Sequence, residues 1–213
     1  MVVTEIMRFS TTAPPEETIT RAVKEFEGVK ALPHFVLGTD IQDMGAFQIM
    51  SEGDGAQDYV DFGRCSRKVC GEPHNVFHVV LSRSALGVDG PATAKVVEFV
   101  QTYFPVSSVT TDFQKKVEED YHKFNEIFSR EVKGRVSVAS GWIQEEQQHQ
   151  YDKLFGDKAK CFLVITGWES KACFDQSVAT DSFKEAIPLM LSWNAPFQMS
   201  FVERKVLDGA KVV

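Results

Sequence analysis

The chain has 213 residues, of which 43% are hydrophobic and 25% are charged, so it is long and apolar enough to fold around a substantial core. Its formal net charge is -7 and its cations form no block, which argues against a nucleic-acid-binding surface because phosphate neutralisation needs clustered cations. No segment has the length and apolar character of a membrane span or signal peptide. We therefore expect a cytoplasmic protein with a small-molecule partner, and no nucleic acid or membrane partner.

Four cysteines are too few for a disulfide scaffold in a chain of this length, and we expect all of them to be free thiols. Cys65, Cys70 and His74 superficially resemble a metal cluster. They lack the close C-x2-C spacing and an obvious fourth ligand, so no metal is expected. The sequence has no dedicated haem motif, and we expect no bound cofactor.

The first half of the chain alternates between predicted strands and helices. Residues 2–9 have the period of a strand, and the Pro14–Glu17 run of proline and acidic residues is typical of a helix start. A second strand follows within LPHFVLGTDIQD, and the short connection Asp40–Ala46 predicts a hairpin into the strand that begins AFQIMS. A final strand is expected within NVFHVVLSR.

The second half repeats this order with longer elements. Residues 96–104 predict a strand, and polar residues 107–112 then lead into a helix that reaches about Glu131. Apolar side chains in this helix recur at three- and four-residue spacing and mark its buried stripe: Phe113, Val117, Tyr121, Phe124 and Phe128. In the last helical region, Pro188 predicts a break or kink just before it, with Asp181 as a possible cap of a new helix.

The two halves can be aligned element by element. The alignment places Glu5 on Glu98, Gly38 on Gly141, Phe47 on Phe162, and His78 on Gln198. Each half thus reads strand, helix, strand, strand, helix, strand, which is the ferredoxin-like pattern. We predict an α+β protein with one ferredoxin-like βαββαβ repeat in residues 1–90 and a second in residues 91–213.

The predicted strands are apolar on both faces. Phe77 and Val79 lie on one face of the fourth strand, while Val76 and Val80 lie on the other. Strands of this kind are buried on both sides, so helices should cover one face and the second repeat's sheet the other. We expect the two antiparallel sheets to face each other as an intramolecular α/β barrel, in a monomer with pseudo-dimeric symmetry or in a homodimer.

The duplicated unit, together with the segments FLVITGWESKACFDQSV and FKEAIPLML of the second half, resembles the dimeric α/β-barrel superfamily. Within it, the chain is similar to antibiotic-biosynthesis monooxygenases and stress-responsive barrel proteins. The resemblance implies a pocket between sheet and helices, often for aromatic or polyketide-like molecules. It also implies activities that range from cofactor-independent oxygenation to cyclisation and haem chemistry. The first half departs from the pattern, with Glu52-Gly53-Asp54 in place of Gly167-Trp168-Glu169.

Four residues are candidates for catalysis. His34 and His78 lie in apolar strands, where an imidazole can act as a general base or can be a core histidine bonded to a carbonyl group. Glu5 and Glu98 occupy equivalent places in an interior strand, where a carboxylate needs a partner such as Arg8 or a polar residue of the last strand. Each carboxyl group either forms a structural ion pair or hydrogen bond, or stays protonated in a dry pocket and acts as an acid.

Four further residues are candidates for substrate binding. Trp142 and Trp168 each follow a glycine at a strand end, where an indole could stack on a planar substrate, although packing is the commoner use of tryptophan. Gln198 keeps a polar side chain in the last strand, and Tyr121 lies on the stripe of the long helix. His122, one position off that stripe, is either a haem ligand or a solvated histidine.

Three functions remain open from the sequence. The leading hypothesis is a cofactor-free enzyme that oxygenates, cyclises or isomerises an apolar aromatic or polyketide-like substrate. The alternative is a non-catalytic stress-response or ligand-binding barrel protein, and the third is a haem-binding barrel.

Overall fold

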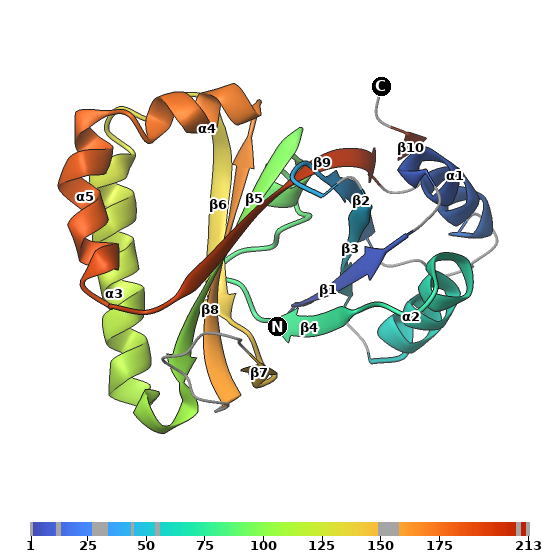
Figure 1. The fold of residues 1–213 in the computed structure, drawn as a ribbon, viewed down its shortest axis with the longest axis horizontal. Helices are drawn as coiled ribbons and strands as arrows, with labels where there is room; N and C mark the ends of the chain where they lie inside the picture. Colours follow the sequence, from blue (N-terminus) through green and yellow to red (C-terminus); the bar gives the residue numbers. More distant parts are fainter. Residues whose placement is uncertain are drawn as a thin grey trace.

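A computed structural model describes residues 2–11, 14–26, 34–43, 45–53, 56–148, 158–207 and 210–211. The first repeat has the order strand, helix, strand, strand, helix, strand (Figure 1). Its elements are β1 (Val3–Ser10), α1 (Pro15–Phe26), β2 (His34–Asp40), β3 (Ala46–Gly53), α2 (Ala56–Cys70) and β4 (Asn75–Val79).

The second repeat has the same order with five small differences: two 3-10 turns, the short strand β7 beside β8, the short strand β10 at the end of β9, and a second helix that is divided into α4 and α5. Its elements are η1 (Pro91–Thr93), β5 (Val96–Pro105), η2 (Val106–Ser108), α3 (Thr111–Phe128), β6 (Arg135–Trp142), β7 (Gln147–Gln148), β8 (Lys158–Trp168), α4 (Lys171–Ser177), α5 (Asp181–Leu191), β9 (Phe197–Leu207) and β10 (Ala210–Lys211). The predicted boundary between residues 90 and 91 falls in the connection from β4 to β5.

All the main strands join one antiparallel sheet in the order β4-β1-β3-β2-β9-β5-β8-β6. Each repeat contributes the ferredoxin-like order, and the two sets are joined by a ladder between β2 and β9. The sheet curls until its outer strands meet again, where Val79 of β4 and Ile143, just after β6, form a single bridge. The predicted α+β fold with two facing ferredoxin-like repeats is confirmed.

The barrel interior is filled by apolar side chains from both repeats. Ile6, Val36 and Phe77 of the first repeat pack there with Phe99 and Leu163 of the second. The opposite faces of the same strands lie under the helices, α1 and α2 on one side and α3, α4 and α5 on the other (Figure 1). The alternation read from the sequence is therefore correct: Phe35 and Leu37 face the helices, and Val36 faces the interior.

The connection between the repeats closes one end of the barrel. Ala85, Leu86 and Ala92 insert into the interior cluster. The Glu52 carboxylate fixes this segment by accepting hydrogen bonds from the amides of Ala85 (2.6 Å) and Leu86 (3.2 Å) and from the hydroxyl groups of Thr4 and Ser84. Four donors on one buried carboxylate satisfy its need for partners, so the linker is part of the core.

The expected helix break near Pro188 is wrong in position. The chain leaves the helix after α4, and Thr180 then caps α5 by accepting a hydrogen bond from the amide of Phe183. Asp181 is the first residue of α5, and Pro188 lies inside it. Thr180 offers a cap three residues before a free amide, which decides where the helix starts, whereas Pro188 only removes one donor near the helix end.

Among the described residues, no helix combines the length and apolar character needed to cross a bilayer. The four cysteines are free, as expected.

Gly38 and Gly141, aligned from the sequence, lie at the two junctions between the repeats. A Cβ atom on Gly38 would lie 2.3 Å from Val202 Cγ1 and 2.7 Å from the Glu203 carbonyl oxygen, across the β2–β9 ladder. A Cβ atom on Gly141 would lie 2.2 Å from the carbonyl oxygen of Val80, just after β4. Both positions need glycine because another backbone passes where a side chain would be.

Substituting either junction glycine by alanine should destabilise the protein by about 1–3 kcal/mol, because the added methyl group forces backbone shifts. Gly63 of α2 is a matched control: a Cβ atom there meets only the end of the Arg67 side chain, and Gly→Ala in a helix is ordinarily favourable. Urea unfolding of Gly38→Ala, Gly141→Ala and Gly63→Ala measures the difference. Equal stability of all three would contradict the close approach at the junctions.

Candidate functional site

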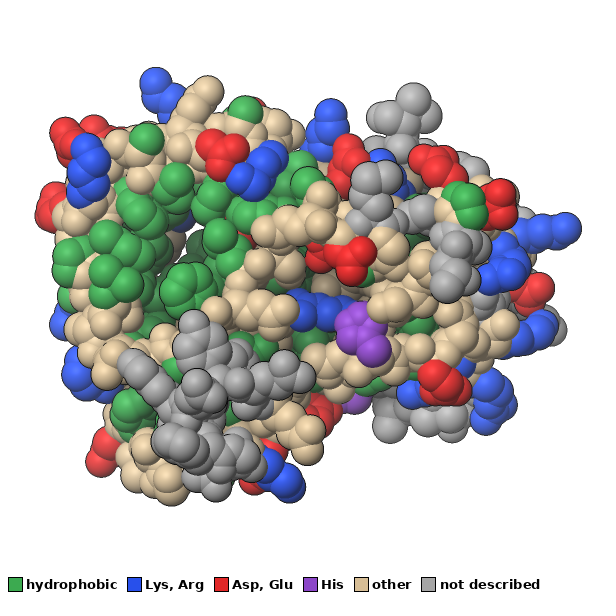
Figure 2. Space-filling view, in the orientation of Figure 1, with side chains coloured by type: hydrophobic (Ala, Val, Ile, Leu, Met, Phe, Trp, Pro, Cys, Tyr) green, Lys and Arg blue, Asp and Glu red, His purple; other side chains and the backbone are tan. Residues whose placement is uncertain are grey.

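Among the described residues, the strand side chains that lie under the helices are more completely buried in the first repeat than in the second. In the first, Met7, Phe9, Phe35, Leu37 and Phe47 face α1 and α2 and are at most 2% exposed. In the second, equally inward side chains remain partly accessible: Val100, Phe124, Val138 and Met199. On the face shown in Figure 2, hydrophobic side chains surround a hollow between the α3–α5 layer and the sheet.

A cavity of about 620 Å³ opens in this layer at the edge strand β6. Its floor is the outer face of the sheet, with Val138, Ser140 and Trp142 from β6 and Phe162 from β8. One wall, Val80–Ser82, comes from the first repeat, just after β4. The cavity is thus a pocket of the second repeat with a wall from the first, and we call it the α3–β6 pocket.

The roof of the α3–β6 pocket is one face of α3. Glu118, Tyr121, His122 and Asn125 line it, at the three- and four-residue spacing that places side chains on one side of a helix. Glu118 accepts a hydrogen bond from the Trp142 indole (3.0 Å), and Asn125 accepts one from Arg135 (2.9 Å). The pocket therefore combines an aromatic body with a few fixed polar groups, as small-molecule sites do.

Glu98 of β5 lies deeper in the same layer. One of its carboxylate oxygens accepts a hydrogen bond from the Trp168 indole (3.0 Å), and the residue is 7% exposed. Burial raises the pKa of Glu98 to about 7, against the opposing effect of hydrogen bonds from Trp168 and Thr166. A carboxyl group that titrates near neutral pH can both accept and donate a proton under ordinary conditions.

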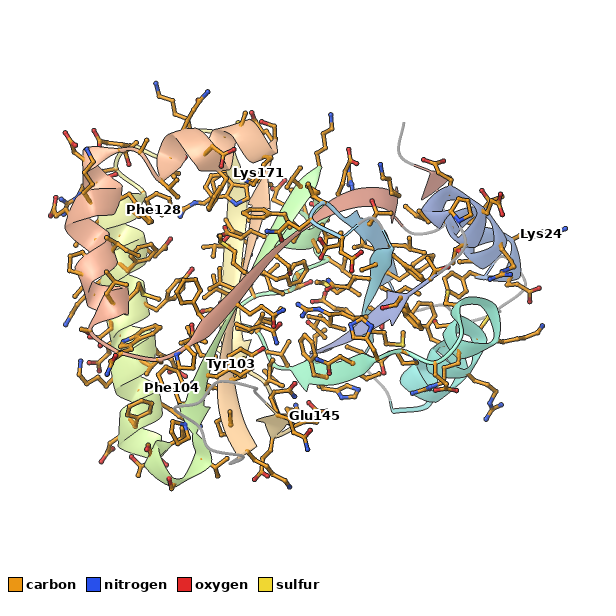
Figure 3. The ribbon with its side chains drawn as sticks, viewed as in Figure 1. Lys24, Tyr103, Phe104, Phe128, Glu145 and Lys171 are labelled. Atoms are coloured by element: carbon orange, nitrogen blue, oxygen red, sulfur yellow. The ribbon has the colours of Figure 1, made fainter. Side chains whose placement is uncertain are left out.

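Tyr121 connects Glu98 to the pocket electrostatically. Burial raises the pKa of the Tyr121 phenol, the positive charge of Arg135 lowers it, and the negative charge of Glu98 raises it. The phenol lines the pocket. Figure 3 shows the aromatic side chains Phe104 and Phe128 in the same layer, on the side of the sheet that faces α3.

Glu5 and His78 are brought together elsewhere. His78 Nε2 lies 3.3 Å from Glu5 Oε1, and His78 Nδ1 lies 2.5 Å from Glu145 Oε1. The hydrogen bonds that the His78 ring donates to Glu5 and Glu145 raise the pKa of His78 to about 9, although burial opposes the shift. The polar residue of the last strand is thus the partner of Glu5, one of the two options that the sequence left open, and neither residue lines the α3–β6 pocket.

The alignment of His78 with Gln198 is wrong by three residues. In the strand ladders Glu5 pairs with His78, whereas Glu98 pairs with Phe201, so Phe201 is the structural counterpart of His78. Gln198 pairs with Gln101 and accepts a hydrogen bond from the Tyr103 hydroxyl group (3.4 Å), on the barrel-interior face of β5. Both copies have a Phe near the start of this strand, and sequence alone could not show that their faces differ.

The remaining candidates are dispersed. His34 begins β2, is exposed, and lines a different cavity of about 560 Å³ beside Glu52 and the linker. Trp168 is 1% exposed and packs against Phe174, so its indole serves Glu98 and not the pocket directly. Of the eight predicted residues, Tyr121 and Trp142 line the α3–β6 pocket, whereas Glu98 and Trp168 are buried and hydrogen-bonded to each other.

Polar pocket residues that were not predicted as binding residues include Glu118, Asn125 and Ser140, and Arg135 donates a hydrogen bond to Asn125. The first two share the helix face of Tyr121, one position from the apolar stripe, so a polar stripe beside the apolar one was the available signal. Arg135 and Ser140 lie on an edge strand, and no sequence pattern marks which side of that strand meets α3.

No known family model and no curated protein matches this sequence. Solved structures do match over the whole chain. The chain has the dimeric α/β-barrel fold. It is similar to an anthrone oxidase-like protein (TM-score 0.61, 13% identity, 100% of this chain and 95% of the other) and to a proposed monooxygenase from Lactobacillus acidophilus (TM-score 0.58, 12% identity, 100% and 98%).

A haem-binding protein from Thermus thermophilus has the same fold (TM-score 0.55, 12% identity, 96% of this chain and 91% of the other). Identities this low establish the architecture of this dimeric α/β barrel and leave its chemistry to the site.

The raised pKa of Glu98 predicts how stability changes with pH. Because the folded pKa lies above the unfolded one, near 4.5, folding is opposed progressively as pH rises from about 4.5 to 7, and the loss is constant above that. At about 1.4 kcal/mol per pH unit the loss approaches ~3 kcal/mol. Glu98→Gln should remove this pH dependence, which denaturant titrations at pH 5 and pH 8 would reveal. Parallel pH profiles in the two proteins would contradict the assignment.

Proposed function

We propose that this protein is a small-molecule enzyme that acts on an apolar aromatic or polyketide-like substrate in the α3–β6 pocket. The observation that carries the proposal is the contrast between the repeats. In the first repeat, phenylalanine side chains bury the strand face under the helices. In the second repeat, the same layer contains the aromatic-lined α3–β6 pocket and the buried carboxyl group of Glu98, whose pKa is about 7. Fold relatives named as monooxygenase and anthrone oxidase-like proteins are consistent with this class of reaction.

The proposed reaction begins with removal of a proton from an electron-rich phenol or enol. The Tyr121 phenol, which lines the pocket, would take the substrate's proton as it passes its own proton to Glu98, the final acceptor, whose charge affects the pKa of Tyr121. The resulting carbanion can reduce molecular oxygen directly, or the same acid and base can move the proton between carbon and oxygen in a cyclisation or isomerisation. Trp142 and Phe162 would hold the planar ring system.

Anthrone with dissolved oxygen, and with no added cofactor, is a direct test of the oxygenation. We expect Glu98→Gln to lower the rate by about 100-fold or more, the usual range for loss of a general base, and Tyr121→Phe to lower it less. The wild-type rate should rise as pH increases through about 7, because the ionised form of Glu98 is required. The variant rates and the pH dependence of the wild-type rate are both measured as oxygen uptake in excess of the rate in buffer alone.

Tyr103→Phe is the matched control, since it removes a phenol that lies in the barrel interior. Equal loss in Tyr103→Phe and Tyr121→Phe would contradict a role for the pocket. If anthrone raises the melting temperature of the wild-type protein without any turnover, the alternative of a ligand-binding barrel replaces the enzyme.

Haem binding is a second candidate because an imidazole, that of His122, lines the pocket. His122 would hold a bound haem, which would supply redox chemistry at its iron. On this proposal, haemin added to the purified protein gives a Soret band that His122→Ala abolishes. A band that persists unchanged in His122→Ala, or that never forms, removes this candidate.

A further inference from the structure

The two junctions between the repeats are closed very differently. At one, β2 and β9 form a ladder from Val36 to Asp40 with one register shift between Leu37 and Gly38, extended by a hydrogen bond from the Ile41 amide to the Phe201 carbonyl oxygen. At the other, which we call the β4–β6 seam, the strands share the Val79–Ile143 bridge and are joined by three hydrogen bonds, two between backbone groups and one from a backbone amide to a side chain. These are Gln144 N to His78 O (2.8 Å), Ser82 N to Ser140 O (2.8 Å) and Ser140 N to Ser82 Oγ (3.1 Å).

The β4–β6 seam is also a wall of the α3–β6 pocket. Val80–Ser82 on one side of the seam, and Ser140 and Trp142 on the other, all line the cavity. Gly141 has no side chain to separate the strands, so the Val80 carbonyl group can approach its backbone closely. Any parting of the seam therefore widens the pocket.

An ion cluster spans the seam. Glu145, which follows β6, accepts hydrogen bonds from the His78 amide (2.8 Å) and ring (2.5 Å), and the other ring nitrogen of His78 lies against Glu5 of β1. Figure 3 shows Glu145 beside β7 and close to β4. One oxygen of Glu5 is buried without a hydrogen-bond partner among the described residues, so Glu5 depends on His78 for compensation. The cluster thus joins the second repeat to two strands of the first.

We propose that the β4–β6 seam is the movable wall of the α3–β6 pocket and that Glu5, His78 and Glu145 hold it closed. The inference builds on the proposed function, because it assigns an entrance to that pocket, and makes His78 and Glu145 positioning residues. A seam closed by one bridge, a few further hydrogen bonds and an ion cluster opens more readily than the β2–β9 ladder, because fewer backbone hydrogen bonds must break. The charged groups that face His78 in the described residues are Glu5 and Glu145.

Amide hydrogen exchange of the ligand-free protein tests the seam. Glu145→Ala should raise exchange at Ser82 and Gln144 by tenfold or more and leave Ile41, at the β2–β9 junction, unchanged. Glu145→Gln, which keeps the shape but not the charge, should lie between alanine and wild type. Glu72→Ala, which removes an exposed surface ion pair with Arg67, is the control. Unchanged exchange at Ser82 in Glu145→Ala, or an equal rise at Ile41, overturns the proposal.

Alkylation of the native cysteines by iodoacetamide at fixed pH gives an independent reading. Cys161 is 0% exposed and packs in the barrel interior with Val79 and Ile143 of the seam, whereas Cys65, Cys70 and Cys173 lie on helices and serve as internal references. Glu145→Ala should speed alkylation of Cys161 by tenfold or more relative to the references. Equal rates in the two proteins would contradict opening at the seam.

The pH dependence separates positioning from simple packing. The pKa of His78, raised to about 9, means that the cluster is fully charged below the ordinary imidazole pKa near 6.5 and loses its positive charge as pH rises through about 9. The ratio of exchange at Ser82 to exchange at Ile41 should rise over this range in the wild-type protein and stay flat in His78→Gln. A flat wild-type ratio overturns the role of His78.

The two proposals fail separately. If the seam responds to Glu145→Ala but anthrone is neither bound nor oxidised, the movable wall stands and the enzyme is rejected. If anthrone is oxidised but the seam does not respond, the enzyme stands and this entrance is rejected.

Discussion

Most main strands of the sheet carry apolar side chains on both faces, and this constraint determines the rest of the architecture. One face must lie under helices and the other must meet a second sheet, because neither can be left in water. Side chains such as Phe77 from one repeat and Phe99 from the other therefore share a single interior. A sheet that must enclose its own inner face has to curl, and the contact that completes the closure, between β4 and β6, has the fewest hydrogen bonds.

Within that shared frame the two copies have diverged in their outer layers. In the first, Phe9 and Phe47 stack at 5.0 Å, and Phe26, Phe35 and Phe62 close the space beneath α1 and α2. In the second, tyrosine, tryptophan and polar side chains line the α3–β6 pocket, which lies between α3 and the sheet. The buried glutamate is kept in both copies, but its partner is an imidazole in the first and an indole in the second.

Most of the fold could be predicted from the sequence because it depends on local period and order. Three features follow from short patterns: the hairpin at Asp40–Ala46, the apolar stripe of α3, and the location of Glu5 and Glu98 on strands that have a neighbouring strand on each side.

The site was harder to predict because it depends on which face of a strand meets which helix. A slip of three residues in the last strand turned Gln198 into the counterpart of His78, although the two side chains lie on opposite faces of the sheet. Trp142 and Tyr121 were chosen correctly, but the hydrogen bond from Trp142 to Glu118 joins elements that only tertiary packing brings together.

The hydrogen bonds that Glu52 accepts from the segment after β4 make the connection between the two repeats a structural part of the core. A tether between two subunits is ordinarily dispensable, since it adds only proximity. Here the tether supplies Ala85, Leu86 and Ala92 to the shared interior, held by the carboxylate of Glu52. Cutting the chain in this segment would therefore disrupt the core that both repeats share. Because the two repeats are parts of one chain, no symmetry requires them to carry the same site.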